Sequence, residues 1–157
     1  MQITLLCIGK TDNNQLLNLI ETYTKRLGHY VKFKIKILPD IKKTKSLSIN
    51  QQKQKEGELL LLQFQTSDHV LLLDEKGQQY TSVSFSKLIQ KKLNGGYKQL
   101  YLVIGGPYGF SEDVYARAQQ KIALSSMTFS HQMVRLLAVE QLYRAFTILK
   151  GEPYHHQ

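Results

Sequence analysis

Short apolar runs recur along the chain, and stretches with helical spacing of apolar residues lie between them. An apolar run of this length, bounded by turn residues, is typical of a buried strand in a parallel sheet. The pattern predicts strands over residues 3–8, 33–37, 69–74, 100–104 and 122–129. It predicts helices over residues 12–28, 49–64, 84–93, 111–118 and 131–150. Because strands and helices alternate, we expect a single α/β domain, residues 1–157, with a mostly parallel sheet flanked by helices.

Turn and cap residues mark the predicted boundaries. Asp12 is a suitable N-cap for the first helix, and Ser111 is suitable for the short helix after the fourth strand. The run Glu75-Lys76-Gly77 predicts a turn directly after the third strand. The last helix is apolar around much of its circumference, so it needs a second partner, which a homodimer would supply.

The fourth strand ends in a glycine-rich run, Gly105-Gly106-Pro107-Tyr108-Gly109, and a helix start follows. Open α/β sheets bind ligands at such places, at the carboxyl ends of their strands. Asp74 ends another buried strand, so we expect Leu73 and Asp74 to lie beside the same pocket. The adjacent glycines do not match the spaced dinucleotide fingerprint. On these residues alone, a tight turn without a ligand is an equally good interpretation.

Composition limits the classes of protein. A chain of 157 residues with 42% hydrophobic and 21% charged residues fits one globular domain. No apolar run approaches ~18 residues, so we expect no transmembrane helix. The N-terminus lacks the basic segment of a signal peptide. Cys7 is the only cysteine and lies within a predicted strand, which indicates a buried thiol. Together these features predict a cytoplasmic protein.

Positive charge is concentrated in one early segment. The formal net charge is +9, which suits a polyanionic partner. Residues 25–55 contain ten lysines and arginines but one acid, Asp40, whereas the rest of the chain is balanced. A solvated surface would explain this charge, but its one-signed clustering favours contact with nucleic acid. The candidates for this contact are Lys25, Arg26, Lys42, Lys43 and Lys45.

Two further motifs lie near the C-terminus. The run SSMTFS occupies residues 125–130, and PYHHQ occupies residues 153–157. Together with IGGPYGFS at residues 104–111, they resemble the RlmH-type methyltransferases of the SPOUT superfamily in order and spacing. The resemblance implies an α/β knot, with a C-terminal trefoil knot in which the chain threads through a loop. It also implies a homodimer that uses S-adenosylmethionine to methylate N3 of a pseudouridine in helix 69 of bacterial 23S rRNA.

The resemblance implies roles for individual residues. Those implied to bind the cofactor are Leu73, Gly106, Ser125, Ser126, Met127, Thr128, Phe129 and Ser130. Tyr154 and His155 match tail residues linked to rRNA binding and turnover. We expect Arg135 and His156 to contact RNA, although many members carry Arg at the position of His156.

The side chains of the tail are compatible with this chemistry. N3 of the target carries a proton at neutral pH, and a positioned base that removes such a proton accelerates a reaction by roughly 10²–10⁴-fold. His155 is the natural candidate, because histidine has a reference pKa of about 6.5. Tyr154 is suited to stack on a splayed base. The alternative is a frayed terminus without a role.

Other interpretations of the whole chain stay open. One is a SPOUT methyltransferase that acts on another RNA, such as tRNA. Another is a non-enzymatic, basic, ribosome-associated factor that binds RNA through residues 25–55. The histidines show no compact spacing with cysteine or acids, so we expect no metal site.

Overall fold

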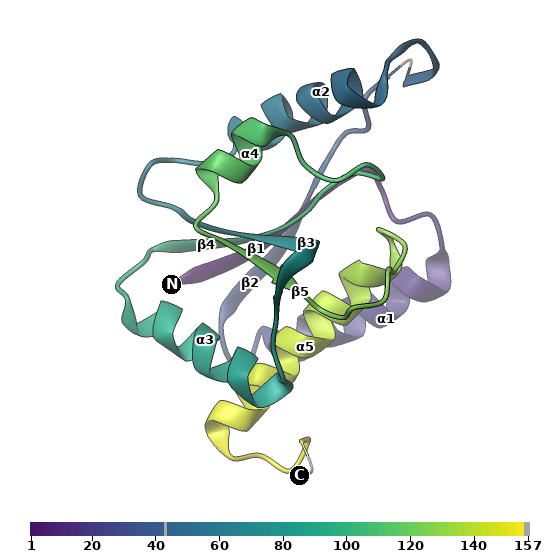
Figure 1. Cartoon of the computed structure of the whole chain (residues 1–157). Helices are drawn as coiled ribbons and strands as arrows, with labels where there is room; N and C mark the ends of the chain where they lie inside the picture. The colour runs from purple at the N-terminus through teal and green to yellow at the C-terminus, as the bar shows by residue number, and fades with distance from the viewer. Residues whose placement is uncertain (43, 156–157) are drawn as a thin grey trace.

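Five strands lie side by side in one sheet, in the order β2-β1-β4-β3-β5, and every adjacent pair is parallel. We analysed this sheet in a computed structural model that describes residues 1–42 and 44–155 (Figure 1). The strands are β1 (Gln2–Ile8), β2 (Lys32–Leu38), β3 (His69–Gln79), β4 (Gln99–Ile104) and β5 (Gln120–Ala123). The predicted α/β class and the parallel sheet are confirmed. The trefoil knot and the single-domain boundary stay predictions.

Helices cover both faces of the sheet. One face carries α1 (Asn14–Leu27), α3 (Ser82–Asn94) and α5 (Met133–Lys150), and the other carries α2 (Ile49–Leu61) and α4 (Glu112–Arg117) (Figure 1). Strand β1 illustrates how residues on both faces of the sheet are buried. Leu5 and Cys7 belong to the core beneath α1, α3 and α5, whereas Leu6 and Ile8 belong to the core beneath α2 and α4. Burial raises the pKa of the Cys7 thiol to about 12, as suits an unreactive core residue.

Several predicted boundaries are wrong. Asn13, not Asp12, caps α1, because its side chain accepts a 2.9 Å hydrogen bond from the Leu16 N–H. The predicted start of the short helix is confirmed, because Ser111 directly precedes α4, although its hydroxyl makes no cap bond. The predicted turn at residues 75–77 is instead part of β3, which continues past a register shift and pairs with β5 again. Gly77 permits this close approach, since a Cβ there would overlap the backbone of Ile122.

Helix α5 has its partners within the chain. It packs against both α1 and α3, and residues such as Val139 and Leu142 are completely buried there. Leu137 and Leu149 of the same helix are only partly buried, so the chain itself covers much but not all of the apolar surface of α5. The homodimer itself stays a prediction. In the described part of the chain, no helix is long and apolar enough to cross a membrane.

Candidate functional site

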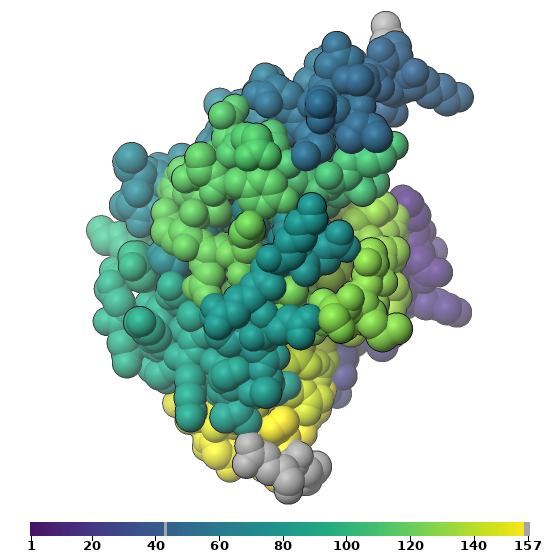
Figure 2. Space-filling model, viewed as in Figure 1, coloured from purple at the N-terminus to yellow at the C-terminus, as the bar shows by residue number. Residues whose placement is uncertain are grey.

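A cavity of about 450 Å³ opens at the carboxyl ends of β4 and β5, beside the middle of β3 where its register with β5 shifts. Three segments form its walls, namely residues 73–76, the glycine loop after β4, and the loop between β5 and α5. In the space-filling view, the teal end of β3 and the yellow-green loop before α5 meet on one face of the molecule (Figure 2). Parallel strands bring these segments together although they are far apart in sequence.

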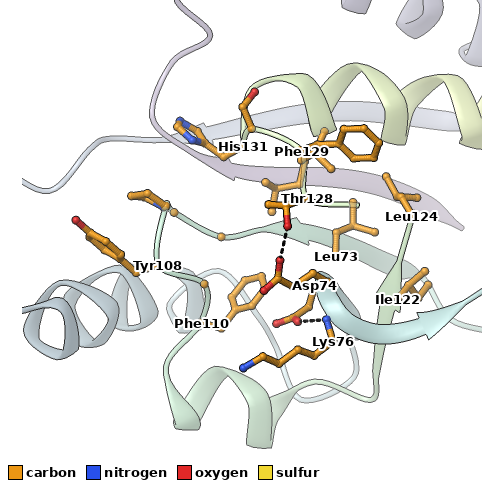
Figure 3. A pocket seen from close by; sticks show the side chains of 18 of the residues that line it. Leu73, Asp74, Lys76, Tyr108, Phe110, Ile122, Leu124, Thr128, Phe129 and His131 are labelled. Atoms are coloured by element: carbon orange, nitrogen blue, oxygen red, sulfur yellow. Dashed lines mark hydrogen bonds between the residues drawn. The ribbon is translucent and has the colours of Figure 1, made fainter. Parts of the chain in front are cut away.

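One part of the pocket lining is aliphatic. It consists of Leu73, Ile104, Ile122, Leu124 and Val134. Figure 3 shows Leu73, Ile122 and Leu124 on the same side of the cavity. Phe110 and Phe129 add aromatic surface. This surface suits a flat, weakly polar group such as a nucleobase.

Two carboxylates give the pocket its polar side. Asp74 accepts a 2.5 Å hydrogen bond from the Tyr115 hydroxyl and a 2.8 Å bond from the Lys76 N–H. Burial and this bond to Asp74 raise the pKa of Tyr115, so the phenol stays protonated and donates. Glu75 accepts a 3.0 Å bond from the Thr128 hydroxyl, which ties β3 to the loop before α5 (Figure 3).

The pocket brings together most of the residues implied to bind a cofactor. Seven of them line it: Leu73, Gly106, Ser125, Met127, Thr128, Phe129 and Ser130. Ser126 is exposed and is not among the lining residues. The loop is shaped by its own hydroxyls, because Ser125 Oγ accepts from the Met127 N–H and Ser130 Oγ accepts from the Met133 N–H.

Sequence reasoning missed other lining residues: Lys53, Glu75, Tyr108, Tyr115 and His131. For Glu75 a usable signal existed, because it directly follows Asp74, which the sequence already placed beside the pocket. Lys53 and Tyr115 lie on helices whose orientation the sequence pattern leaves open.

The burial and hydrogen bonds of Arg135 contradict the prediction that it contacts RNA. Its side chain is buried, with 1% of its surface exposed. The guanidinium donates to the Ile8 carbonyl at 2.7 Å, to the Thr11 hydroxyl at 2.9 Å and to the His131 carbonyl at 3.2 Å. Arg135 therefore fixes the start of α5 against the end of β1, and it is unavailable to a phosphate.

The tail lies away from this pocket. Tyr154 donates a 3.0 Å hydrogen bond to Glu140, which also accepts a 2.6 Å bond from Arg144. Arg144 lies 3.4 Å from His155 Nδ1 and stacks over the Tyr154 ring. Burial and hydrogen bonding raise the pKa of Tyr154. Neither Tyr154 nor His155 lines the pocket of its own chain.

The basic candidates occupy two separate places. Lys25 and Arg26 are exposed at the end of α1, and Arg26 packs over the rings of Tyr23 and Tyr143 near the tail. Lys42 and Lys45 are exposed after β2, at the pocket edge of the sheet. Strand β2 separates the two groups by about 20 Å. Lys43 and His156 lie outside the described residues.

A metal site has no support in the described part of the chain. Within residues 1–42 and 44–155, no three His, Cys, Asp or Glu side chains gather as potential ligands.

Comparison with known proteins identifies the family. A family model described as "Predicted SPOUT methyltransferase" matches residues 1–155. The chain is 65% identical to the ribosomal RNA large subunit methyltransferase H of Christiangramia forsetii, over the full length of both chains. The proteins of the same name from Flavobacterium johnsoniae and Parabacteroides distasonis are 60% and 54% identical over the same extent. The family model matches nearly the whole chain, and two of the three motifs line one pocket, so this protein belongs to the SPOUT methyltransferase family.

Proposed function

We propose that this protein uses S-adenosylmethionine to methylate large-subunit ribosomal RNA, at N3 of a pseudouridine in helix 69. The observation that carries the proposal is the cavity of about 450 Å³ that residues 73–76 line together with two of the motif segments, the glycine loop and residues 125–130. The full-length relatives are named as methyltransferases of large-subunit ribosomal RNA, which supports the same substrate class. Such an enzyme would work in the cytoplasm, where bacterial ribosomes are assembled.

The pocket suits this cofactor in size and chemistry. Its volume falls within the range of about 300–1,000 Å³ that is usual for small-molecule sites. The aliphatic surface around Leu73 and Ile122 fits an adenine ring. Asp74 and Glu75 place negative charge at a site for a ligand with positive sulfonium and ammonium groups. The main chain of the two loops offers N–H and C=O groups for its polar edges.

The chain's own residues have two tasks in this reaction. When bound, S-adenosylmethionine supplies an electrophilic methyl group. The glycine loop and residues 125–130 hold the donor and exclude water, and such orientation lowers a barrier by roughly 7–11 kcal/mol. The second task is to accept the N3 proton, and His155 is the proposed base, with Tyr154 stacked on the target base.

The position of the tail supports a homodimer. Because His155 does not line the pocket of its own chain, we propose that the tail of a second copy completes each site. Leu17 and Leu19 leave 42% and 49% of their surfaces exposed on α1, which provides apolar surface for a partner. A mixture of two inactive variants, Gly106→Val and His155→Ala, should therefore regain activity, since mixed dimers contain one intact composite site. Lack of any recovery despite subunit exchange would contradict this arrangement.

A lysine in the pocket lining and two exposed lysines after β2 support an RNA substrate. Lys53 lines the cavity, and Lys42 and Lys45 lie exposed on the connection that leads to its helix. Cations in these positions would neutralise phosphates next to the target nucleotide.

Calorimetric titration with S-adenosylmethionine, followed by methyl transfer from labelled donor, tests the proposal. We expect micromolar binding and incorporation into large subunits that lack the modification, with the methyl group at N3 by mass spectrometry. Bulk tRNA serves as the competing substrate. Label in tRNA would favour the other RNA class, and salt-sensitive RNA binding without cofactor binding would favour the non-enzymatic factor.

A further inference from the structure

We propose that Glu56 of α2 is a positioning residue for the cofactor pocket, and that Gly106 is glycine because the Glu56 carboxyl group occupies the space of a side chain there. This inference rests on the proposed function, since it gives the glycine loop the task of holding a cofactor. It assigns a role to a buried acid that the proposed reaction does not otherwise use.

Glu56 is an unusual residue for the buried face of a helix. Only 3% of its surface is exposed. Gln52 donates a 2.9 Å hydrogen bond to Oε1, but Oε2 has no hydrogen-bond partner among the described residues. Burying a carboxyl oxygen without a hydrogen-bond partner lowers the stability of the fold. The presence of Glu56 at this position therefore calls for a specific reason.

The carboxyl group lies directly behind the glycine loop. A Cβ atom at position 106 would overlap Oε2 of Glu56, and all three of its nearest neighbours would be atoms of that carboxyl group. The next residue on α2 makes an equivalent contact, because a Cβ at Gly57 would overlap the Ser111 hydroxyl. Helix α2 therefore supports the loop near both ends, at Gly106 and at Ser111.

This support acts on the pocket because Gly106 is one of its lining residues, whereas Glu56 is not. The carboxyl group touches the loop from behind and limits how far it can move toward α2. Burial and the nearby charge of Asp40 raise the pKa of Glu56, which favours the neutral form in this dry contact. Glu56 would thus act through Gly106 and not on the substrate itself.

A different reason for Gly106 is direct approach of the cofactor to the loop backbone. The two explanations predict opposite results for a double variant. If the cofactor needs the space, Gly106→Ala stays defective whatever occupies position 56. If Glu56 needs the space, shortening Glu56 relieves the overlap and restores the loop.

The experiment compares Gly106→Ala, Glu56→Ala and the double variant with the wild type. The first readout is affinity for S-adenosylmethionine by calorimetry, and the second is hydrogen exchange of the residue 105–110 amides without cofactor. We expect Gly106→Ala to bind S-adenosylmethionine about tenfold more weakly and its loop amides to exchange faster. Because the two residues are in direct contact, the double variant should recover most of the affinity and most of the protection from exchange. Glu56→Gln, which keeps the shape of the side chain, should retain the wild-type affinity. Glu58→Ala, on the exposed side of α2, is the control that should give no rescue.

The outcomes separate the proposal from its premise. A double variant as defective as Gly106→Ala, in both affinity and exchange, would overturn the role of Glu56. If Gly106→Ala does not fold, recovery of folded protein in the double variant is the expected rescue, and failure of both overturns the proposal. If the wild type binds no S-adenosylmethionine, the proposed function fails, while hydrogen exchange still tests the Glu56–Gly106 contact.

Discussion

Thr128 donates its hydroxyl proton to Glu75 across 3.0 Å, and this contact joins two walls of the pocket that lie 53 residues apart in sequence. Both residues also line the cavity (Figure 3). Glu75 therefore combines two properties, a negative charge at the site and a hydrogen bond that holds the loop before α5.

Glu75→Gln separates these two properties, because the amide keeps an acceptor for Thr128 but removes the charge. S-adenosylmethionine carries a positive sulfonium, whereas its demethylated product has a neutral sulfur. We expect the variant to weaken the methyl donor about threefold to tenfold more than the product, as measured by calorimetry with both ligands. Glu21→Gln, an exposed acid on α1, is the matched control. Equal weakening of both ligands would show that the charge does not discriminate between them.

His155→Ala should leave the fold and cofactor binding intact, because other side chains line the cavity and the proposed task of His155 is to accept the proton of the target base. Turnover on large subunits should fall by roughly 10²–10⁴-fold if His155 accepts the N3 proton. The measurement is single-turnover methyl transfer, with His29→Ala as a control at another exposed histidine. Turnover equal to the wild type would remove His155 from the catalytic assignment.

Arg135→Met and Lys45→Met should have opposite phenotypes. The first removes a buried guanidinium and leaves the Ile8 and His131 carbonyls without their donor, so it should cost roughly 2–5 kcal/mol of unfolding free energy. Lys45→Met should leave stability unchanged and weaken RNA binding. It should also reduce the slope of log binding constant against log salt concentration by about one, the value for one lost phosphate contact. Urea unfolding and RNA binding at several salt concentrations measure the two effects. A stable Arg135→Met protein with weakened RNA binding would instead support the original prediction that Arg135 contacts RNA.

His69 predicts how stability depends on pH. Its side chain is buried against the Tyr97 ring, and desolvation, with the charges of Lys92 and Arg117, lowers its pKa from 6.5 to about 4. The unfolded chain therefore binds a proton between pH 6.5 and 4 that the folded chain does not, so stability falls as the pH falls through this window. This contribution reaches at most about 3 kcal/mol.

The variant His69→Phe tests this prediction, because phenylalanine can pack on Tyr97 but does not titrate. Urea midpoints at pH 7.5 and pH 4.5 should differ less for the variant than for the wild type. An identical loss of stability in both proteins would assign the pH dependence to other groups.

The sequence was informative where a local pattern decides the structure. The apolar runs that became β1 and β4 are buried on both faces, and the turn at Gly105-Gly106 marks the pocket correctly. Matched motifs also placed Leu73 and Thr128 in the same cavity, although one lies on β3 and the other on the loop before α5.

The predictions that were wrong depend on contacts between residues far apart in the sequence. A charged residue on an apolar helix face, such as Arg135, has the same local pattern whether it reaches RNA or a backbone carbonyl 127 residues away. The continuation of β3 past Gly77 depends on the register with β5, which no periodicity within β3 encodes. Likewise, the tail residues could be recognised, but the contacts of Tyr154 with α5 could not be foreseen.

The bond between Arg135 and the Ile8 carbonyl also has a consequence for how the protein is made. Strand β1 is synthesised long before α5, and the start of α5 emerges only after all five strands of the sheet. Until then the end of β1 lacks its guanidinium donor, and the loop before α5, which forms one wall of the pocket, has not been anchored. A nascent chain that ends before α5 therefore has an unanchored pocket wall, and under the proposed function its binding of S-adenosylmethionine would report that α5 has been added.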